Sequence, residues 1–359
     1  MTVIGVDPGS RSWSIIKLEE DYSIHEIRIP SEQVKERPER ISEYIETSKN
    51  IQTVVVPSGY GLPLKQLSSL TEKDFTLLTL KHPDESRILG LSEVLNNLKN
   101  AGFPGFVLPG VIHLSTVPKH RKLNRIDMGT PDKVCSVAVA LKTLSERQNL
   151  TYDECCFVLV EAGSAFTAVI GVQFGKIVDG IGGAEGCMGY RARGGMDGEL
   201  CYLIKDFQKD SIYRGGFLDI IGTLIEPPLV DQKFLEDQKH KKGWKGLVEE
   251  TAKDVISVSL SCTPDYVMLS GSLAANPIFH TTLQKITERS LPIQFISLPQ
   301  IYAVKETALG AAYIADGIRG GENAPIVDIL ELRGASGTCL DYICLKEELK
   351  IDIQSIIGV

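Results

Sequence analysis

The segment VIGVDPGSRSWSIIKL at residues 3–18 has a counterpart in FVLVEAGSAFTAVIGV at residues 157–172. Each begins with an apolar run of strand length and then reaches an acidic residue, Asp7 or Glu161. Each turns through glycine and serine and returns through a second apolar run. Repetition of the same strand, turn and strand predicts a duplicated lobe.

Length and composition restrict the class of protein. With 359 residues the chain favours two domains over one compact core. Its net charge of -8 argues against nucleic-acid binding through bulk positive charge. No apolar run reaches the roughly 18–20 residues that cross a bilayer, and the start lacks a signal-peptide pattern. The eight cysteines include no C-x-x-C pair, so zinc ligation is not indicated. We expect a cytoplasmic protein without nucleic-acid or membrane partners.

Other elements follow from hydrophobic periodicity and from turn residues. Helices are predicted at 32–49, 90–101, from 132 onward, and at 247–261, 282–288 and 306–318. Strands are predicted at 53–56, 110–114, 266–270 and 293–296. The short basic run at 240–245 is interpreted as a surface loop. We place an N-terminal lobe at 1–155, with the helix at about 304–320 packing back on it. A second lobe covers 156–303, and 321–359 is an appended segment without a readable motif.

Three turns have the composition of phosphate or nucleotide contacts. In the first, Gly9 permits close backbone approach, the Ser10 hydroxyl can donate to phosphate, and Asp7 can hold Mg²⁺ through water. The second offers Glu161 in the acidic position, Gly163 in the turn, and Ser164 and Thr167 as donors. In the third, Gly271 and Ser272 follow a predicted strand, where bare backbone lets a nucleoside lie close. For each turn alone, an ordinary structural turn is the alternative.

Charged residues near residue 130 are candidates for catalysis. Asp127 and Asp132 flank a helix start, beside Arg121 and Arg125. One of the two carboxylates could act as a base or hold a metal-bound water, and Arg125 could clamp a carboxylate with two hydrogen bonds. A capped helix with surface ion pairs is the alternative. Arg191 and Arg193 fall in a Gly-rich stretch of the kind that often forms substrate loops, with a solvated loop as the alternative.

The order of these features resembles a known superfamily. A hairpin near 7, a helix near 132, a hairpin near 161, a glycine turn near 271 and an Ala/Gly helix near 310 follow one another. This succession is similar to the sugar kinases, actin and heat-shock chaperones, with two phosphate motifs, an adenosine motif and two connecting helices. The resemblance implies an α/β fold of two ribonuclease H-like, actin-like ATPase lobes with a nucleotide cleft between them.

Within that superfamily the chain resembles archaeal proteins described as predicted butyrate kinases, a domain family of unknown function. The likeness rests on GVDPGS at 5–10, DMGT at 127–130, EAG at 161–163 and ETALGAA at 306–312. Acetate and butyrate kinases of this architecture bind Mg-ATP, which implies ATP and Mg²⁺ as cofactors. By position in these kinases, Glu306 would approach Mg²⁺, or would only cap its helix. Those kinases carry Asn where this chain has Asp7, and their His-containing substrate motifs have no match.

The resemblance therefore implies an ATP-dependent phosphotransferase acting on a small-molecule acceptor, for example a short-chain carboxylic acid such as butyrate. An ATP-gated regulatory ATPase acting on a protein partner is the alternative, because actin-like lobes also couple nucleotide binding to movement. A homodimer is the expected assembly on general grounds.

Overall fold

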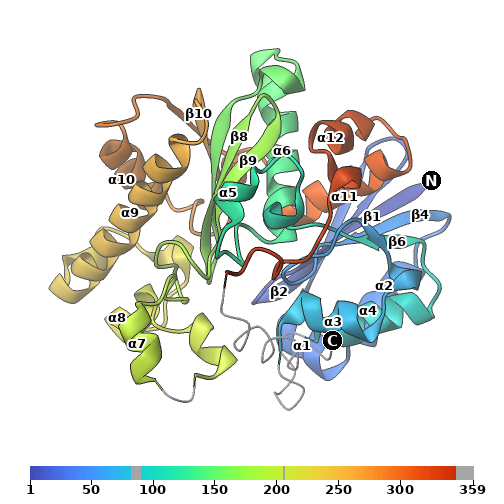
Figure 1. Cartoon of the computed structure of the whole chain (residues 1–359), viewed down its shortest axis with the longest axis horizontal. Helices are drawn as coiled ribbons and strands as arrows, with labels where there is room; N and C mark the ends of the chain where they lie inside the picture. The colour runs from blue at the N-terminus through green and yellow to red at the C-terminus, as the bar shows by residue number, and fades with distance from the viewer. Residues whose placement is uncertain (82–89, 205–206, 345–359) are drawn as a thin grey trace. The chain divides into compact units, whose positions relative to one another are not determined.

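The computed structural model describes residues 1–81, 90–204 and 207–344 (Figure 1). The chain divides into two compact units. Unit 1 comprises Met1–Ile126, Thr130–Gln148 and the chain from Thr307 onward, and unit 2 comprises Asp127–Gly129 and Asn149–Glu306. Among the described residues, no helix is both long enough and apolar enough to span a bilayer.

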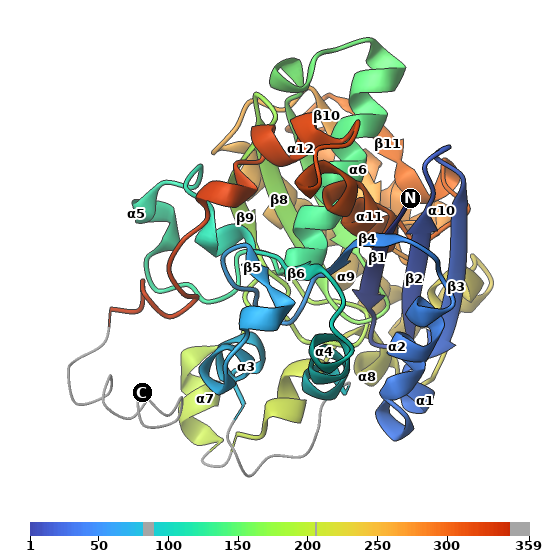
Figure 2. The same cartoon turned by 90° about the vertical axis from the view of Figure 1, so that its right-hand side faces the viewer.

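A six-stranded mixed sheet forms the centre of unit 1, in the order β3-β2-β1-β4-β6-β5. Its strands are Thr2–Pro8 (β1), Ser12–Leu18 (β2), Ile24–Pro30 (β3), Ile51–Val56 (β4), Lys65–Gln66 (β5) and Gly105–Val107 (β6). β1 is antiparallel to β2 and parallel to β4. Figure 2 shows β1, β2 and β3 side by side. The predicted first hairpin is confirmed.

Helices cover the sheet of unit 1. They are Ser31–Glu36 (α1), Glu39–Glu46 (α2), Glu72–Thr79 (α3), Leu91–Asn100 (α4), Lys119–Lys122 (α5), Pro131–Gln148 (α6), Glu306–Ile318 (α11) and Ala324–Ile329 (α12). The predicted single helix at 32–49 is wrong, because Pro38 excludes the helical conformation at Arg37, whose φ is -137°. The predicted strand at 110–114 is also wrong. That segment holds a 3₁₀ turn in which the His113 N–H donates to the Gly110 carbonyl at 3.1 Å.

Two glycines bring β1, α6 and α11 into backbone contact. A Cβ added at Gly5 of β1 would lie 2.2 Å from the Ala308 carbonyl oxygen of α11. A Cβ added at Gly310 of α11 would lie 1.9 Å from the Cys135 carbonyl oxygen of α6. No side chain fits in either space, so α11 rests directly on both the sheet and α6.

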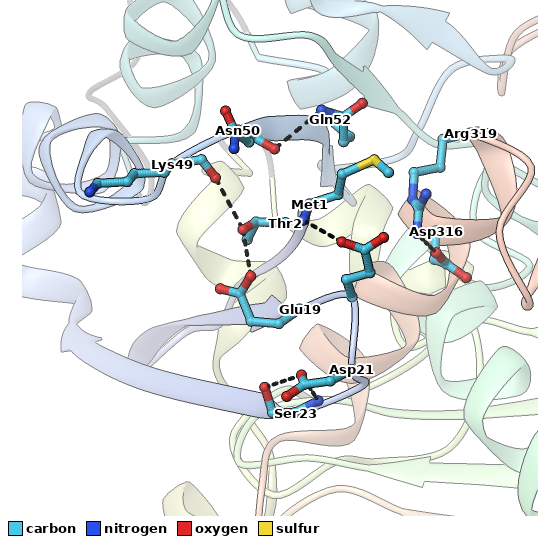
Figure 3. A network of polar contacts seen from close by, with 11 residues as sticks. Met1, Thr2, Glu19, Asp21, Ser23, Lys49, Asn50, Gln52, Asp316 and Arg319 are labelled. Carbon is cyan, nitrogen blue, oxygen red and sulfur yellow. Dashed lines mark hydrogen bonds and ion pairs between the residues drawn. The ribbon is translucent and has the colours of Figure 1, made fainter.

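The N-terminal end of β1 is held by a polar network (Figure 3). The Thr2 hydroxyl donates to the Glu19 carboxylate at 2.7 Å and is 3.2 Å from the Lys49 carbonyl oxygen. These contacts join the start of β1 to the end of β2 and to the turn before β4. They stabilise the end of the strand opposite to Asp7.

Unit 2 repeats the topology of unit 1. Its sheet has the order β11-β10-β7-β8-β9, with strands Phe157–Ala162 (β7), Thr167–Gln173 (β8), Lys176–Ile181 (β9), Tyr266–Ser270 (β10) and Gln294–Ser297 (β11). β7 is antiparallel to β8 and parallel to β10, as β1 is to β2 and β4. The predicted duplication of the lobe is therefore confirmed.

The helices of unit 2 are Gly198–Leu203 (α7), Phe217–Ile221 (α8), Gln238–Ser259 (α9) and Pro277–Thr287 (α10). Figure 1 shows α9 and α10 side by side. The interpretation of 240–245 as a loop is wrong, because the Asp237 carboxylate accepts the N–H groups of Lys239 and His240 and starts α9 before them. Trp244 on α9 is buried and packs edge-on against Phe217 and Phe279.

The described residues beyond 320 belong to unit 1. Ser336 donates its N–H to the His113 carbonyl at 3.0 Å, and Asn124 donates its N–H to the Tyr342 carbonyl at 2.9 Å. These bonds hold the chain after α12 against the segment from 113 to 124. The remainder of the predicted appended segment, 345–359, lies outside the described residues.

Candidate functional site

The hairpin of unit 1 carries Asp7 at the carboxyl end of the central strand. Asp7 pairs with Ser14 across the turn and is 5% exposed. Gly9 donates its N–H to the Asp7 carbonyl at 2.9 Å, and its own carbonyl accepts the Ser31 hydroxyl at 2.7 Å. A Cβ at Gly9 would lie 2.5 Å from the Ser12 carbonyl oxygen, so only glycine fits this turn.

The hairpin of unit 2 has the same length. Glu161 pairs with Ala168 as Asp7 pairs with Ser14, and Glu161 is 4% exposed. The two turns align residue by residue as VDPGS and VEAGS. In both, the carboxylate lies beside the turn glycine. An Oδ2 of Asp7 is 3.7 Å from the Cβ position of Gly9, and Oε1 of Glu161 is 3.5 Å from that of Gly163.

Gly271 completes the hairpin of unit 2. Its φ is +95°, and a Cβ there would lie 2.4 Å from the Ala162 carbonyl oxygen and 2.9 Å from Oε1 of Glu161. The Ala162 carbonyl also accepts the Leu273 N–H at 2.9 Å. The predicted third turn therefore lies directly against the second, and the glycine is required by both conformation and contact.

Three buried hydroxyl groups lie at the end of the sheet that carries Glu161. Ser270 pairs with Glu161 across β10, and Thr167 pairs with Ala162 across β8. The hydroxyl oxygens of Thr167, Ser270 and Ser272 are buried, and none has a hydrogen-bond partner among the described residues. An unsatisfied buried polar group costs about 1–3 kcal/mol. This end of the sheet thus fits a ligand rich in oxygen acceptors, such as a phosphate.

In unit 1, Asp7 and Asp132 both lie within electrostatic range of Cys135. The pKa of the Cys135 thiol is raised well above its usual value by burial, and further by the charges of Asp132 and Asp7. The Thr130 hydroxyl donates to the Asp132 carboxylate, and Lys133 Nζ lies 2.5 Å from Oδ2 of Asp132. Asp7 is thus buried and Asp132 partly buried, and Lys133 places one cation beside Asp132 at the start of α6.

Lys133 is a functional candidate that the sequence analysis missed. It is 9% exposed although it lies in the first turn of α6, where the helix dipole disfavours a cation. In the sequence, only its position directly after Asp132 indicated that Lys133 belongs to the candidate site.

Asp127 is not grouped with Asp132. It belongs to unit 2, where its carboxylate accepts the N–H groups of Gly129 at 3.0 Å and Ala184 at 3.1 Å. Its backbone carbonyl accepts the Gly182 N–H at 3.1 Å. One carboxylate oxygen holds the Gly-rich loop and the other holds the turn at Gly129, so the geometry favours a structural role over the catalytic one predicted for Asp127.

The remaining candidates lie at other points of the chain. Arg125 follows α5 in unit 1, and its N–H donates to the Lys122 carbonyl at 3.1 Å. Glu306 is 5% exposed at the first position of α11. Among the described residues, no group of three or more His, Cys, Asp or Glu side chains gathers as a metal site. Mg²⁺ in nucleotide enzymes is usually held by one or two carboxylates together with phosphates, and Asp7 in unit 1 and Glu161 and Glu306 in unit 2 each carry a carboxylate of this kind.

Comparison with known proteins agrees with the fold. A family model described as "Protein of unknown function (DUF1464)" matches residues 5–345. No curated protein matches the chain. A propionate kinase from Francisella tularensis subsp. tularensis SCHU S4 superposes with a TM-score of 0.65 at 12% identity, covering 87% of this chain and 98% of that one. Porphyromonas gingivalis acetate kinase gives 0.63 at 13% identity, covering 89% and 99%. The predicted actin-like α/β fold is thereby confirmed.

Proposed function

The chain belongs to the DUF1464 family of proteins of unknown function, and we propose that it is an ATP-dependent phosphotransferase acting on a small molecule. The duplicated hairpin carries this proposal. In each unit, a buried carboxylate at the end of the central strand lies beside the glycine of an equally long turn. Turns of this kind present N–H groups and hydroxyls to phosphate oxygens. The kinase fold of the similar structures supports the same class.

We assign the nucleotide to the hairpin of unit 2. Gly163 and Ser164 form the turn, and Thr167, Ser270 and Ser272, whose hydroxyls have no partner among the described residues, supply donors at the end of the sheet that carries Glu161. Gly271 leaves the adjacent backbone bare because no side chain fits there. A ligand that accepts hydrogen bonds from these hydroxyls removes a penalty of about 1–3 kcal/mol for each one.

We assign the acceptor chemistry to Asp7, Asp132 and Lys133 in unit 1, with Gly9 and Ser10 as phosphate contacts. The acceptor oxygen forms a bond to the γ-phosphorus of ATP while the bond to the ADP oxygen breaks. A hydroxyl acceptor passes its proton to Asp132, whereas a carboxylate acceptor has no proton to lose. Lys133 balances the charge of Asp132 at 2.5 Å. Mg²⁺, when bound with ATP, would be held by Asp7, Glu161 or Glu306 and would neutralise phosphate charge.

The proposal is tested by ADP release from Mg-ATP in the presence of single acceptors, with butyrate as the acid that the family resemblance names. Asp7→Ala removes the carboxylate, and Glu161→Gln keeps the side-chain shape and removes the charge, so each should reduce kcat by about 10²–10³-fold. Asp328→Asn is the control, because that carboxylate is 73% exposed on α12 and should change nothing.

Absence of Mg-ATP binding would contradict the proposal. Slow hydrolysis that no acceptor accelerates would instead favour the ATP-gated regulator acting on a protein partner.

A further inference from the structure

Three arginines lie on a short two-stranded ribbon beside the hairpin of unit 2. The ribbon is formed by an antiparallel bridge between Ala192 and Gly215. That register places Arg193 opposite Arg214 and Arg191 opposite Gly216. The Gly216 N–H donates to the Arg191 carbonyl at 2.8 Å, as the register requires.

The bridge brings the three arginine positions together on the ribbon. Side chains alternate along an extended strand, so Arg191 and Arg193 lie on the same side of their strand. Ala192, between the two, is fully buried, which assigns the other face to the interior. Arg191 and Arg214 are exposed and Arg193 is partly buried. The atoms Nε and Nη2 of Arg193 both lie 3.6 Å from the Cβ position of Gly215.

None of the three has an ion pair or a side-chain hydrogen bond with any residue in the described part of the chain. The Asp219 carboxylate of α8 accepts the Gly215 N–H. Like charges directly opposite one another on two strands destabilise the pair. The backbone of the ribbon therefore holds three guanidinium groups together although no ion pair with another described residue neutralises their charge.

The ribbon is attached rigidly to the tip of the candidate nucleotide hairpin. The N–H groups of Arg191 and Ala192 both donate to the Ala165 carbonyl, at 3.0 and 3.1 Å. Tyr213, which precedes Arg214, packs edge-on against Phe166 with ring centroids 5.2 Å apart. Both strands thus contact the turn that contains Gly163 and Ser164.

We infer that this arginine ribbon binds an anion and that the phosphoryl acceptor carries at least two negative charges, as in a dicarboxylate or a phosphate monoester. A planar guanidinium binds a carboxylate or phosphate through two parallel hydrogen bonds. A single carboxylate group cannot form such bonds with Arg193, Arg214 and Arg191 at once. The acceptor part of this inference rests on the proposed phosphotransferase function, whereas the anion site does not.

Acceptors matched in carbon skeleton test the inference. ADP release from Mg-ATP is measured with butyrate against succinate, and with glycerol against glycerol 3-phosphate. We expect kcat/KM to be at least about tenfold higher for the more highly charged member of a pair, and to fall about 10- to 100-fold in Arg193→Gln or Arg214→Gln. Arg289→Gln removes an exposed arginine on another part of unit 2 and should leave kcat/KM unchanged. Equal use of the paired acceptors, or indifference to both substitutions, would overturn the inference.

Binding without nucleotide separates this inference from the kinase proposal. Calorimetric titration with succinate and with inorganic phosphate should show binding that weakens about tenfold or more in Arg214→Gln and in high salt. If no acceptor supports ADP release but this difference holds, the anion site stands and the kinase proposal fails. If the wild type and Arg214→Gln bind both anions equally, the arginine ribbon is not an anion site, whatever the kinetics show.

Discussion

Gly271→Ala is expected to destabilise unit 2 and weaken nucleotide binding, whereas Gly163→Ala on the adjoining turn is expected to leave unit 2 as stable as the wild type or slightly more stable. The new methyl at residue 271 would lie 2.4 Å from the Ala162 carbonyl oxygen and 2.9 Å from Oε1 of Glu161. A side chain at φ +95° costs about 1–3 kcal/mol, and relieving the clash costs about 1–3 kcal/mol more. The expected loss is therefore about 2–6 kcal/mol.

Gly163 provides the matched control. The nearest atom to its Cβ position is Oε1 of Glu161 at 3.5 Å, an ordinary van der Waals contact, and its φ is not in the positive region. Alanine at such a position restricts the unfolded chain and stabilises a protein by about 0.4–1 kcal/mol.

Urea unfolding followed by tryptophan fluorescence measures both changes. The chain has two tryptophans, Trp13 in the core of unit 1 and Trp244 in the core of unit 2. A Trp13→Phe background leaves Trp244 as the reporter of unit 2, and titration with a fluorescent ATP analogue gives the affinity. Equal losses for Gly271→Ala and Gly163→Ala, or an unchanged midpoint for Gly271→Ala, would refute the reasoning.

Three further substitutions and one control test the packing and the buried polar groups. Gly310→Ala should lower the free energy of unfolding by about 2–4 kcal/mol, because its Cβ would lie 1.9 Å from the backbone of α6. The control Gly102→Ala meets nothing within 4 Å and should lose only the about 1–2 kcal/mol that its positive φ costs. Its urea midpoint should therefore fall about half as far as that of Gly310→Ala. Burial lowers the pKa of His113 from 6.5 to about 4. As the pH falls, His113 is protonated in the unfolded chain before it is protonated in the folded protein. The free energy of unfolding should therefore fall by about 3 kcal/mol between pH 6.5 and pH 4. His113→Gln should abolish that part of the pH dependence in unfolding curves. Asn276→Ala should lower the thermal midpoint through a loss of about 2–4 kcal/mol in the free energy of unfolding. Its side chain donates to the Pro227 and Val230 carbonyls and accepts two N–H groups at the start of α10. An unchanged midpoint would contradict this.

The hairpins could be predicted because their information is local. Apolar runs that end at Asp7 and Glu161, followed by glycine and serine, specify strand, turn and return strand within a few residues. The helix at Glu306–Ile318 was predicted to the residue for the same reason, since its small residues continue without a break. Local signals also misled where one residue overrode periodicity, as Pro38 does between α1 and α2.

Long-range contacts decided the composition of the candidate site. Asp127 and Asp132 are five positions apart in sequence, yet Asp127 belongs to the Gly-rich loop of unit 2 because Gly180 and Gly182 admit the 127–129 backbone at contact distance. The pairing of Arg193 with Arg214 depends on a single bridge. Which side chains meet at such points depends on packing between distant segments, and the residue types alone carry no record of it.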